Sequence, residues 1–177
     1  ELFEKLTNQM HESLESAISL ALYNKNQEVE PLHVLWALVT NTNSILNQAL
    51  NKMGVDKTAL ELKIKSGAKK YVSVSSVTKE SIKISRNVIT TLENAQGVMS
   101  KLGDAFIAVD TWLIANVSSG ELKEVLAKYV DIREFVKSLE AIRGNRQIDS
   151  KGGDDALEAL DKYGMDLTEK AREGKID

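Results

Sequence analysis

The most constraining feature of this 177-residue sequence is a helical pattern that occurs twice, once in each half of the chain. Three blocks of the first half align with the second half, at sequence-number offsets of 78, 75 and 74. The aligned blocks are Val29, Leu35, Ala37 and Val39 with Ile107, Leu113, Ala115 and Val117; Val55, Asp56, Leu60 and Ile64 with Val130, Asp131, Phe135 and Leu139; and Ile18 and Ala21 with Leu92 and Ala95. Small changes of offset are typical of insertions in loops. The sequence therefore predicts an internal duplication, with two copies related by a pseudo-twofold axis.

Each copy predicts four helices, so the expected fold class is all-α. In the first copy, apolar residues recur at helical spacing from Met10 to Leu22, and Thr7 precedes them as an N-cap. Further helices are expected over residues 32–39 after Pro31, over 44–52, and from Asp56 onward. The single proline and the many alanine, leucine, lysine and glutamate residues are typical of helical proteins.

The second copy predicts a long helix that opens at Thr78, a turn over 103–108, and helices over 111–117 and 121–129. A last helix follows Asp131, which forms a capping-box pattern with Glu134. Residues 71–77 have the composition of a strand, but their serines favour an extended connector. The expected domain is therefore 1–143, with repeats at about 1–70 and 78–143. The polar, glycine-rich residues 144–153 predict a flexible linker, and 154–177 begin a further helical segment.

Composition and charge exclude several classes of function. The net charge is −3 and basic residues gather only at 63–70, so no nucleic-acid partner is expected. The chain has no cysteine, and neither His11 nor His33 has a second ligand at helical spacing, so neither a metal site nor a catalytic constellation is expected. We interpret His33 as a structural hydrogen-bonding residue, and Trp36 and Trp112 as core residues. No stretch approaches the roughly 18 apolar residues of a membrane span, so a cytoplasmic protein is expected.

Three passages resemble the N-terminal Clp repeat domain of the bacterial ClpB/Hsp100 disaggregase family. They are NQEVEPLH at 26–33, GDAFI at 103–107 and YGMDLTEKAREGKID at 163–177. The third resembles the segment that opens the first AAA+ module of that family, and the opening Leu6-Thr7-Asn8 resembles the start of its ClpB-type members. The resemblance covers essentially the whole chain, and it implies that 154–177 are the incomplete start of an AAA+ module.

The resemblance implies a substrate-recognition domain and not an enzyme. In that family the domain binds unfolded or aggregated polypeptides and delivers them to a hexameric AAA+ ring. The full-length protein is expected to be a stress-response homohexamer that uses ATP and Mg²⁺, contains a coiled coil, and works with an Hsp70-type co-chaperone system. This chain contains no Gly-x-x-x-x-Gly-Lys-Ser/Thr loop, so no cofactor is expected within it, and the isolated chain is expected to be a monomer.

The resemblance also implies a set of substrate-binding residues. They are Thr7, Asp104 and Asp110, and the hydrophobic-groove positions Leu92, Val98 and Thr111. Asp110 replaces the glutamate that is usual in the family, and Asn94 and Thr111 place polar side chains in the groove, which predicts a shifted or weaker groove. Each residue has a structural alternative: helix capping for Thr7 and Asp110, a turn for Asp104, and core packing for Leu92.

Two other functions remain open at the level of sequence. The same fold serves as an adaptor-docking N-domain in protease-partner Clp ATPases of the ClpC and ClpA type. A free-standing helical regulator without a ring is the third possibility. The opening Leu6-Thr7-Asn8 and the tail at 163–177 favour the disaggregase over the adaptor-docking domain. The tail also argues against a free-standing regulator, because it resembles the beginning of another domain.

Overall fold

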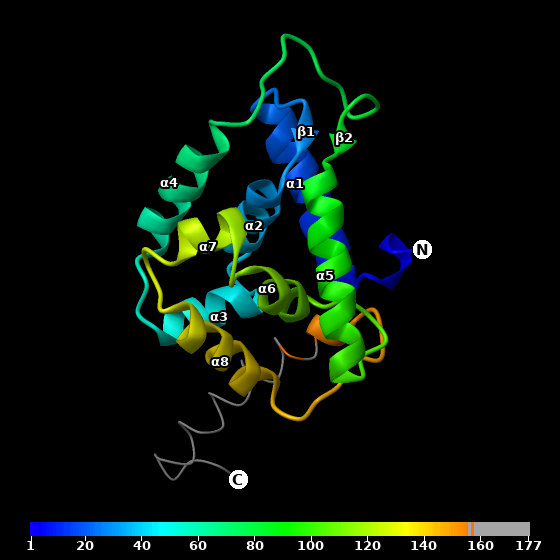
Figure 1. Ribbon diagram of the computed structural model, residues 1–177, viewed down its shortest axis with the longest axis vertical. Helices are drawn as coiled ribbons and strands as arrows, with labels where there is room; N and C mark the ends of the chain where they lie inside the picture. Colours follow the sequence, from blue (N-terminus) through cyan, green and yellow to red (C-terminus); the bar gives the residue numbers. More distant parts are fainter. Residues whose placement is uncertain (156, 158–177) are drawn as a thin grey trace, which may run out of the picture.

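The computed structural model describes residues 1–155 and 157, and its helices form two groups of four (Figure 1). The first repeat contains η1 (Phe3–Lys5), α1 (Asn8–Tyr23), α2 (Pro31–Thr40), α3 (Ile45–Lys52) and α4 (Lys57–Ala68). The second contains α5 (Arg86–Leu102), α6 (Val109–Asn116), α7 (Gly120–Leu126) and α8 (Ile132–Arg143). The predicted all-α fold of two four-helix repeats is confirmed. Two short strands, β1 (Glu28–Val29) and β2 (Lys83–Ile84), pair in parallel just before α2 and α5.

The two repeats are interlocked through one hydrophobic core. Within each repeat the first two helices pack together, α1 on α2 and α5 on α6. Between repeats, α3 contacts α6 and α8, while α7 contacts α2 and α4 (Figure 1). The duplication extends to the backbone: Lys25 and Gly103, which are equivalent positions of the two copies, have φ angles of 56° and 73°. A residue with a side chain, such as Lys25, rarely adopts a positive φ angle. The left-handed conformation at both equivalent positions is therefore an independent sign of the duplication.

Local sequence determines where several helices begin. The hydroxyl of Thr7 accepts a hydrogen bond from the backbone N–H of Met10 at 3.3 Å, which confirms the predicted N-cap of α1. Asp56 caps α4 in the same way, and Asp131 caps α8 by accepting from the N–H of Glu134. An N-cap oxygen satisfies one backbone donor that has no partner inside the helix.

The prediction that the long helix opens at Thr78 was wrong. Thr78 and Ser81 instead close a turn, in which the Ser81 N–H donates to the Thr78 hydroxyl at 3.2 Å. The next residues pair with β1, and the N–H of Ser85 donates to the carbonyl of Val29 at 3.0 Å. Ser85 then caps α5, which begins at Arg86. A polar Thr-x-x-Ser turn has the same local pattern as an N-cap, so sequence alone did not separate the two. The next helix, α6, starts at residue 109, just before the predicted 111.

This difference gives a direct test. Ser85→Ala is expected to reduce the free energy of unfolding by about 1 kcal/mol, because the buried N–H of Val88 loses its capping acceptor. Thr78→Ala is the matched control and is expected to cost less than about 0.5 kcal/mol, because its turn is exposed. Urea denaturation followed by circular dichroism measures both. Equal effects would contradict the assignment of Ser85 as the cap.

Candidate functional site

An arginine with two aspartates forms a buried ionic cluster at the end of α8. Nε and Nη2 of Arg143 donate to the two oxygens of Asp110 at 2.9 and 2.8 Å. Nη1 of Arg143 donates to both oxygens of Asp104, at 3.0 and 2.9 Å. All three side chains are at most 7 % exposed. The cluster thus ties α8 to the start of α6 and to the turn after α5.

In this cluster, the two aspartates offset the effect of burial on the pKa of Arg143. Burial alone would lower the pKa of Arg143, but the hydrogen bonds and charges of Asp110 and Asp104 raise it above its ordinary value. The arginine therefore stays charged. Its single positive charge balances one of the two buried carboxylates, while its planar guanidinium donates hydrogen bonds to both. Removing the arginine leaves both buried carboxylates without a counter-charge, which is strongly destabilising.

The segment after α8 differs from the flexible linker expected over 144–153. Ile148 is buried, its N–H donates to Asp104 at 2.9 Å, and its carbonyl accepts from Ala105 at 2.8 Å. Further along, the carbonyl of Lys151 accepts from the N–H of Asn8. These bonds fix the segment against the start of α1 and the turn before α6. The division of the chain into domains stays a prediction. The helical tail was expected over 154–177, of which 156 and 158–177 lie outside the described residues.

Near the end of this segment, the carboxylate of Asp154 is buried. One oxygen accepts from the backbone N–H of Val109, the first residue of α6, at 3.1 Å. Burial raises the pKa of Asp154 to about 7, aided by the charge of Asp110 and opposed by the hydroxyl of Thr7, the N–H of Val109 and the charge of Arg143. The segment 144–155 is thus joined to the domain through a carboxyl group that titrates near neutral pH.

The structure brings four of the six predicted site residues into this one region. Thr7, Asp104, Asp110 and Thr111 are all buried around segment 144–155 or the Arg143 cluster. Asp110 is not the N-cap of α6, which is Ala108, but its Oδ1 accepts from the backbone N–H of Thr111 at 2.8 Å, so it does satisfy a backbone donor in the first turn of that helix. The two remaining residues lie on α5: Leu92 is fully buried in the core and Val98 is half-buried.

The second repeat carries a pocket of mixed polar and apolar lining near these α5 positions. Asn94 donates to the side chain of Asn116 at 3.1 Å, and Asn116 in turn donates to the carbonyl of Thr91. The pocket around them has a volume of about 360 Å³. Amides and hydroxyls line it together with the apolar side chains of Pro31 and Leu122.

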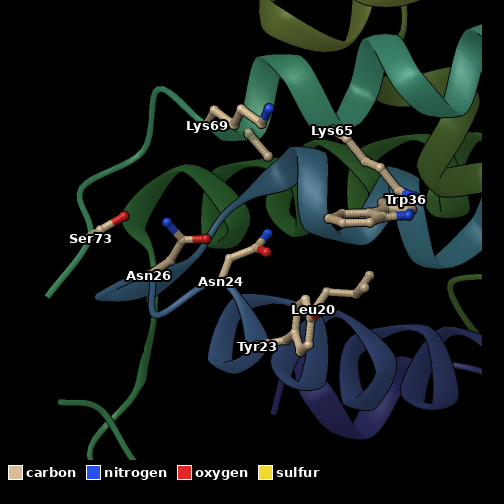
Figure 2. Close-up of a pocket in the computed structure, with 9 residues that line it drawn as sticks. Leu20, Tyr23, Asn24, Asn26, Trp36, Lys65, Lys69 and Ser73 are labelled. Carbon is tan, nitrogen blue, oxygen red and sulfur yellow. The ribbon is translucent and has the colours of Figure 1, made fainter. Parts of the chain in front are cut away.

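A second pocket, with a volume of about 440 Å³, lies in the first repeat. Figure 2 shows Leu20 and Tyr23 on α1 below the ring of Trp36, which Lys65 approaches from α4. The ammonium of Lys65 lies 5.2 Å from the ring centroid, within the range of a cation–π contact. Lys69 lies one turn further along, at the end of α4, on the same edge of the pocket as Lys65 (Figure 2). Sequence reasoning placed both tryptophans in the core; Trp112 is fully buried, whereas Trp36 also lines this pocket.

His33 stabilises the loop beside this pocket. Its Nδ1 accepts from the backbone N–H of Glu30 at 2.9 Å, so its Nε2 carries the proton and donates to Asn26 at 2.9 Å. Burial lowers the pKa of His33 to about 4, which keeps the ring neutral at physiological pH. The interpretation of His33 as a structural hydrogen-bonding residue is confirmed.

Across residues 1–155 and 157, no three histidine or acidic side chains converge in a way that could hold a metal ion. Within the same part of the chain, no helix is long and apolar enough to cross a membrane.

The sequence of the duplicated helices matches the model of a known protein family. A family model described as the Clp repeat (R) N-terminal domain matches residues 5–129. This chain belongs to the Clp repeat N-terminal domain family. The resemblance seen in the sequence is therefore confirmed. Relatives include the chaperone protein ClpB of Wolinella succinogenes, 54 % identical over 99 % of this chain, and that of Helicobacter hepaticus, 52 % identical over 99 %. The chain spans about a fifth of the length of these relatives, 20 % in each case.

Solved structures show that the Clp repeat fold is shared widely. The Hsp104 N-terminal domain of Candida albicans matches with a TM-score of 0.75 at 20 % identity, over 85 % of this chain and 99 % of that one. The ClpV N-domain of Vibrio cholerae matches with a TM-score of 0.64 at 22 % identity, over 79 % and 86 %. At such identities these similarities establish the fold alone. The chain is an N-terminal domain of the Clp repeat type.

Proposed function

We propose that this Clp repeat domain binds unfolded or aggregated polypeptides and delivers them to an AAA+ ring. The observation that carries the proposal is the match at 54 % identity, over 99 % of this chain, to a protein named a ClpB chaperone. In this proposal the whole protein is a cytoplasmic homohexamer that hydrolyses ATP with Mg²⁺ and works with an Hsp70-type system. The residues of this chain offer no phosphate loop, so nucleotide binding lies outside them.

The six residues taken from the resemblance divide into two groups in this proposal. Thr7, Asp104 and Asp110 affect client handling indirectly: Asp104 accepts from the N–H of Ile148, Asp110 holds Arg143, which also bonds Asp104, and the Thr7 hydroxyl lowers the pKa of Asp154. Leu92, Val98 and Thr111 support the α5 and α6 face, where Val98 is the one half-buried side chain. A segment fixed in this way restricts how the domain moves relative to whatever follows it.

The test is a titration of the isotopically labelled chain with an unfolded protein, reduced and carboxymethylated α-lactalbumin. We expect shifts of surface resonances with a dissociation constant in the micromolar range or weaker, because a disordered client loses entropy when it is ordered on binding. Native α-lactalbumin is the control and should cause no shifts. If no resonance moves at saturating client concentration, the proposed function is wrong. Binding of a folded partner alone would favour the adaptor-docking alternative.

A further inference from the structure

The pocket of the first repeat occupies the place that corresponds to the groove predicted in the second. The alignment that pairs Ile18 and Ala21 with Leu92 and Ala95 also pairs Leu20 with Asn94 and Asn24 with Val98. Leu20 and Asn24 both lie in the lining of the first-repeat pocket. The duplication therefore gives the domain two equivalent surfaces, and the two differ in chemistry.

The first repeat has no counterpart of the Arg143–Asp104 ion pair, and this explains why its pocket is open. The alignment of α4 with α8 pairs Ala68 with Arg143, and the alignment of Val29 with Ile107 pairs Asn26 with Asp104. Ala68 and Asn26 line the first-repeat pocket, whereas Arg143 and Asp104 fill their own site with a buried ion pair. An alanine methyl in place of a guanidinium leaves space between α1 and α4.

The open pocket combines aromatic surface with positive charge. Tyr23 is 86 % exposed, an unusual state for a large aromatic side chain, and the ring of Trp36 lies at the base of the pocket (Figure 2). Lys65 is partly compensated by Glu61 at 3.4 Å, but Lys69 has no carboxylate at ion-pair distance among the residues that the structure describes. Aromatic rings with lysines beside them complement a ligand that has both an apolar ring and a carboxylate.

We propose that this first-repeat pocket is a client-binding site for an extended segment with an aromatic residue next to acidic residues. The inference rests on the proposed client-binding function and deepens it. The aromatic side chain packs between Leu20, Tyr23 and Trp36, and the carboxylates lie toward Lys69 and Lys65. The second repeat, whose corresponding site is filled by the Arg143 cluster, contributes less to client affinity. A volume of about 440 Å³ is enough for one aromatic side chain with its flanking backbone.

The probe is a short Gly/Ser peptide with a central Phe-Asp-Glu, compared with peptides that carry Phe-Lys-Lys or Ser-Asp-Glu. The readout is the pair of indole N–H resonances of the labelled chain. We expect the Phe-Asp-Glu peptide to move the Trp36 resonance and to leave that of Trp112 in place, because Trp112 is buried and bonded to Thr91. Both altered peptides are expected to bind about tenfold more weakly, since each lacks one of the two complementary groups.

Variants of exposed residues locate the site without disturbing the fold. Tyr23→Ser and Lys69→Glu are each expected to weaken the Phe-Asp-Glu peptide by roughly tenfold. Leu102→Ser and Lys101→Glu, on exposed positions of α5, are the matched controls and should leave its affinity unchanged. An unmoved Trp112 resonance in the free variants shows that the core is intact.

The outcomes separate this inference from the function on which it rests. If unfolded α-lactalbumin moves resonances of α5 and α6 but neither it nor the peptide moves that of Trp36, the pocket is not the site and client binding stands. Equal affinity of Tyr23→Ser and the parent chain for the Phe-Asp-Glu peptide also overturns the inference. If no polypeptide moves any resonance, the proposed function itself is wrong and the inference is wrong with it.

Discussion

Replacing Arg143 with methionine is expected to reduce the free energy of unfolding by about 3–5 kcal/mol. The substitution keeps an unbranched side chain of similar reach but leaves Asp104 and Asp110 as two buried carboxylates without a counter-charge. A domain of this size is commonly stable by about 5–15 kcal/mol, so the variant is expected to be marginal. Urea denaturation at neutral pH, followed by circular dichroism, measures the loss.

Two further variants show whether the loss comes from uncompensated charge. Arg133→Met, an exposed arginine on the same helix, is the matched control and should cost less than about 0.5 kcal/mol. Adding Asp104→Asn and Asp110→Asn to Arg143→Met should recover part of the stability, because no buried charge is then left unpaired. A cost below about 1 kcal/mol for Arg143→Met alone would contradict a buried cluster.

The same variant tests how segment 144–155 is held. Asp104 accepts from the N–H of Ile148 and is itself oriented by Arg143. We expect the amides of Ile148 and Ala105 to exchange hydrogen faster in Arg143→Met under conditions where the rest of the domain is folded. Local opening of this kind is measured separately from global unfolding by native-state hydrogen exchange.

The repeat architecture could be predicted from the sequence because it depends on periodicity. Spacing of apolar residues at three and four positions identifies helices, and the return of the same pattern in the second half identifies the duplication. The N-cap of α1 at Thr7 is likewise a local feature, since the cap and its donor Met10 are close in sequence. The start of α5 was missed because Thr78 and Ser85 have the same local pattern, and only pairing with β1 separates them.

The ionic cluster could not be predicted because its members are distant in sequence. Arg143 lies far along the chain from both Asp110 and Asp104, and an arginine in a last helical turn is usually solvated. The duplication did contain a signal: Arg143 occupies the position of Ala68, a buried core residue of the first repeat. A charged side chain at a core position requires a partner. Ile148, an isolated apolar residue in a polar stretch, was a second signal that 144–153 would pack on the domain.

Asp154→Asn is expected to change how the stability of the domain depends on pH. Burial raises the pKa of Asp154 from 3.8 to about 7 in the folded state, so between these values the folded chain binds more protons than the unfolded chain. The contribution of this carboxyl to stability is therefore full below pH 3.8, is lost as the pH rises toward 7, and is constant above that. The asparagine keeps an oxygen that can accept from the N–H of Val109 and does not ionise.

The difference in unfolding free energy between Asp154→Asn and the parent chain should accordingly grow by roughly 2–4 kcal/mol from pH 4 to pH 8, in favour of the variant. Urea denaturation across this range measures it, and the amide resonance of Val109 should titrate with a midpoint near neutral pH in the parent chain alone. Asp149→Asn removes an exposed charge from the same segment and controls for net charge. Parallel pH profiles for Asp154→Asn and the parent would mean that this carboxylate is solvated. In that case, ionisation of Asp154 near physiological pH would not loosen the attachment of segment 144–155 to α6.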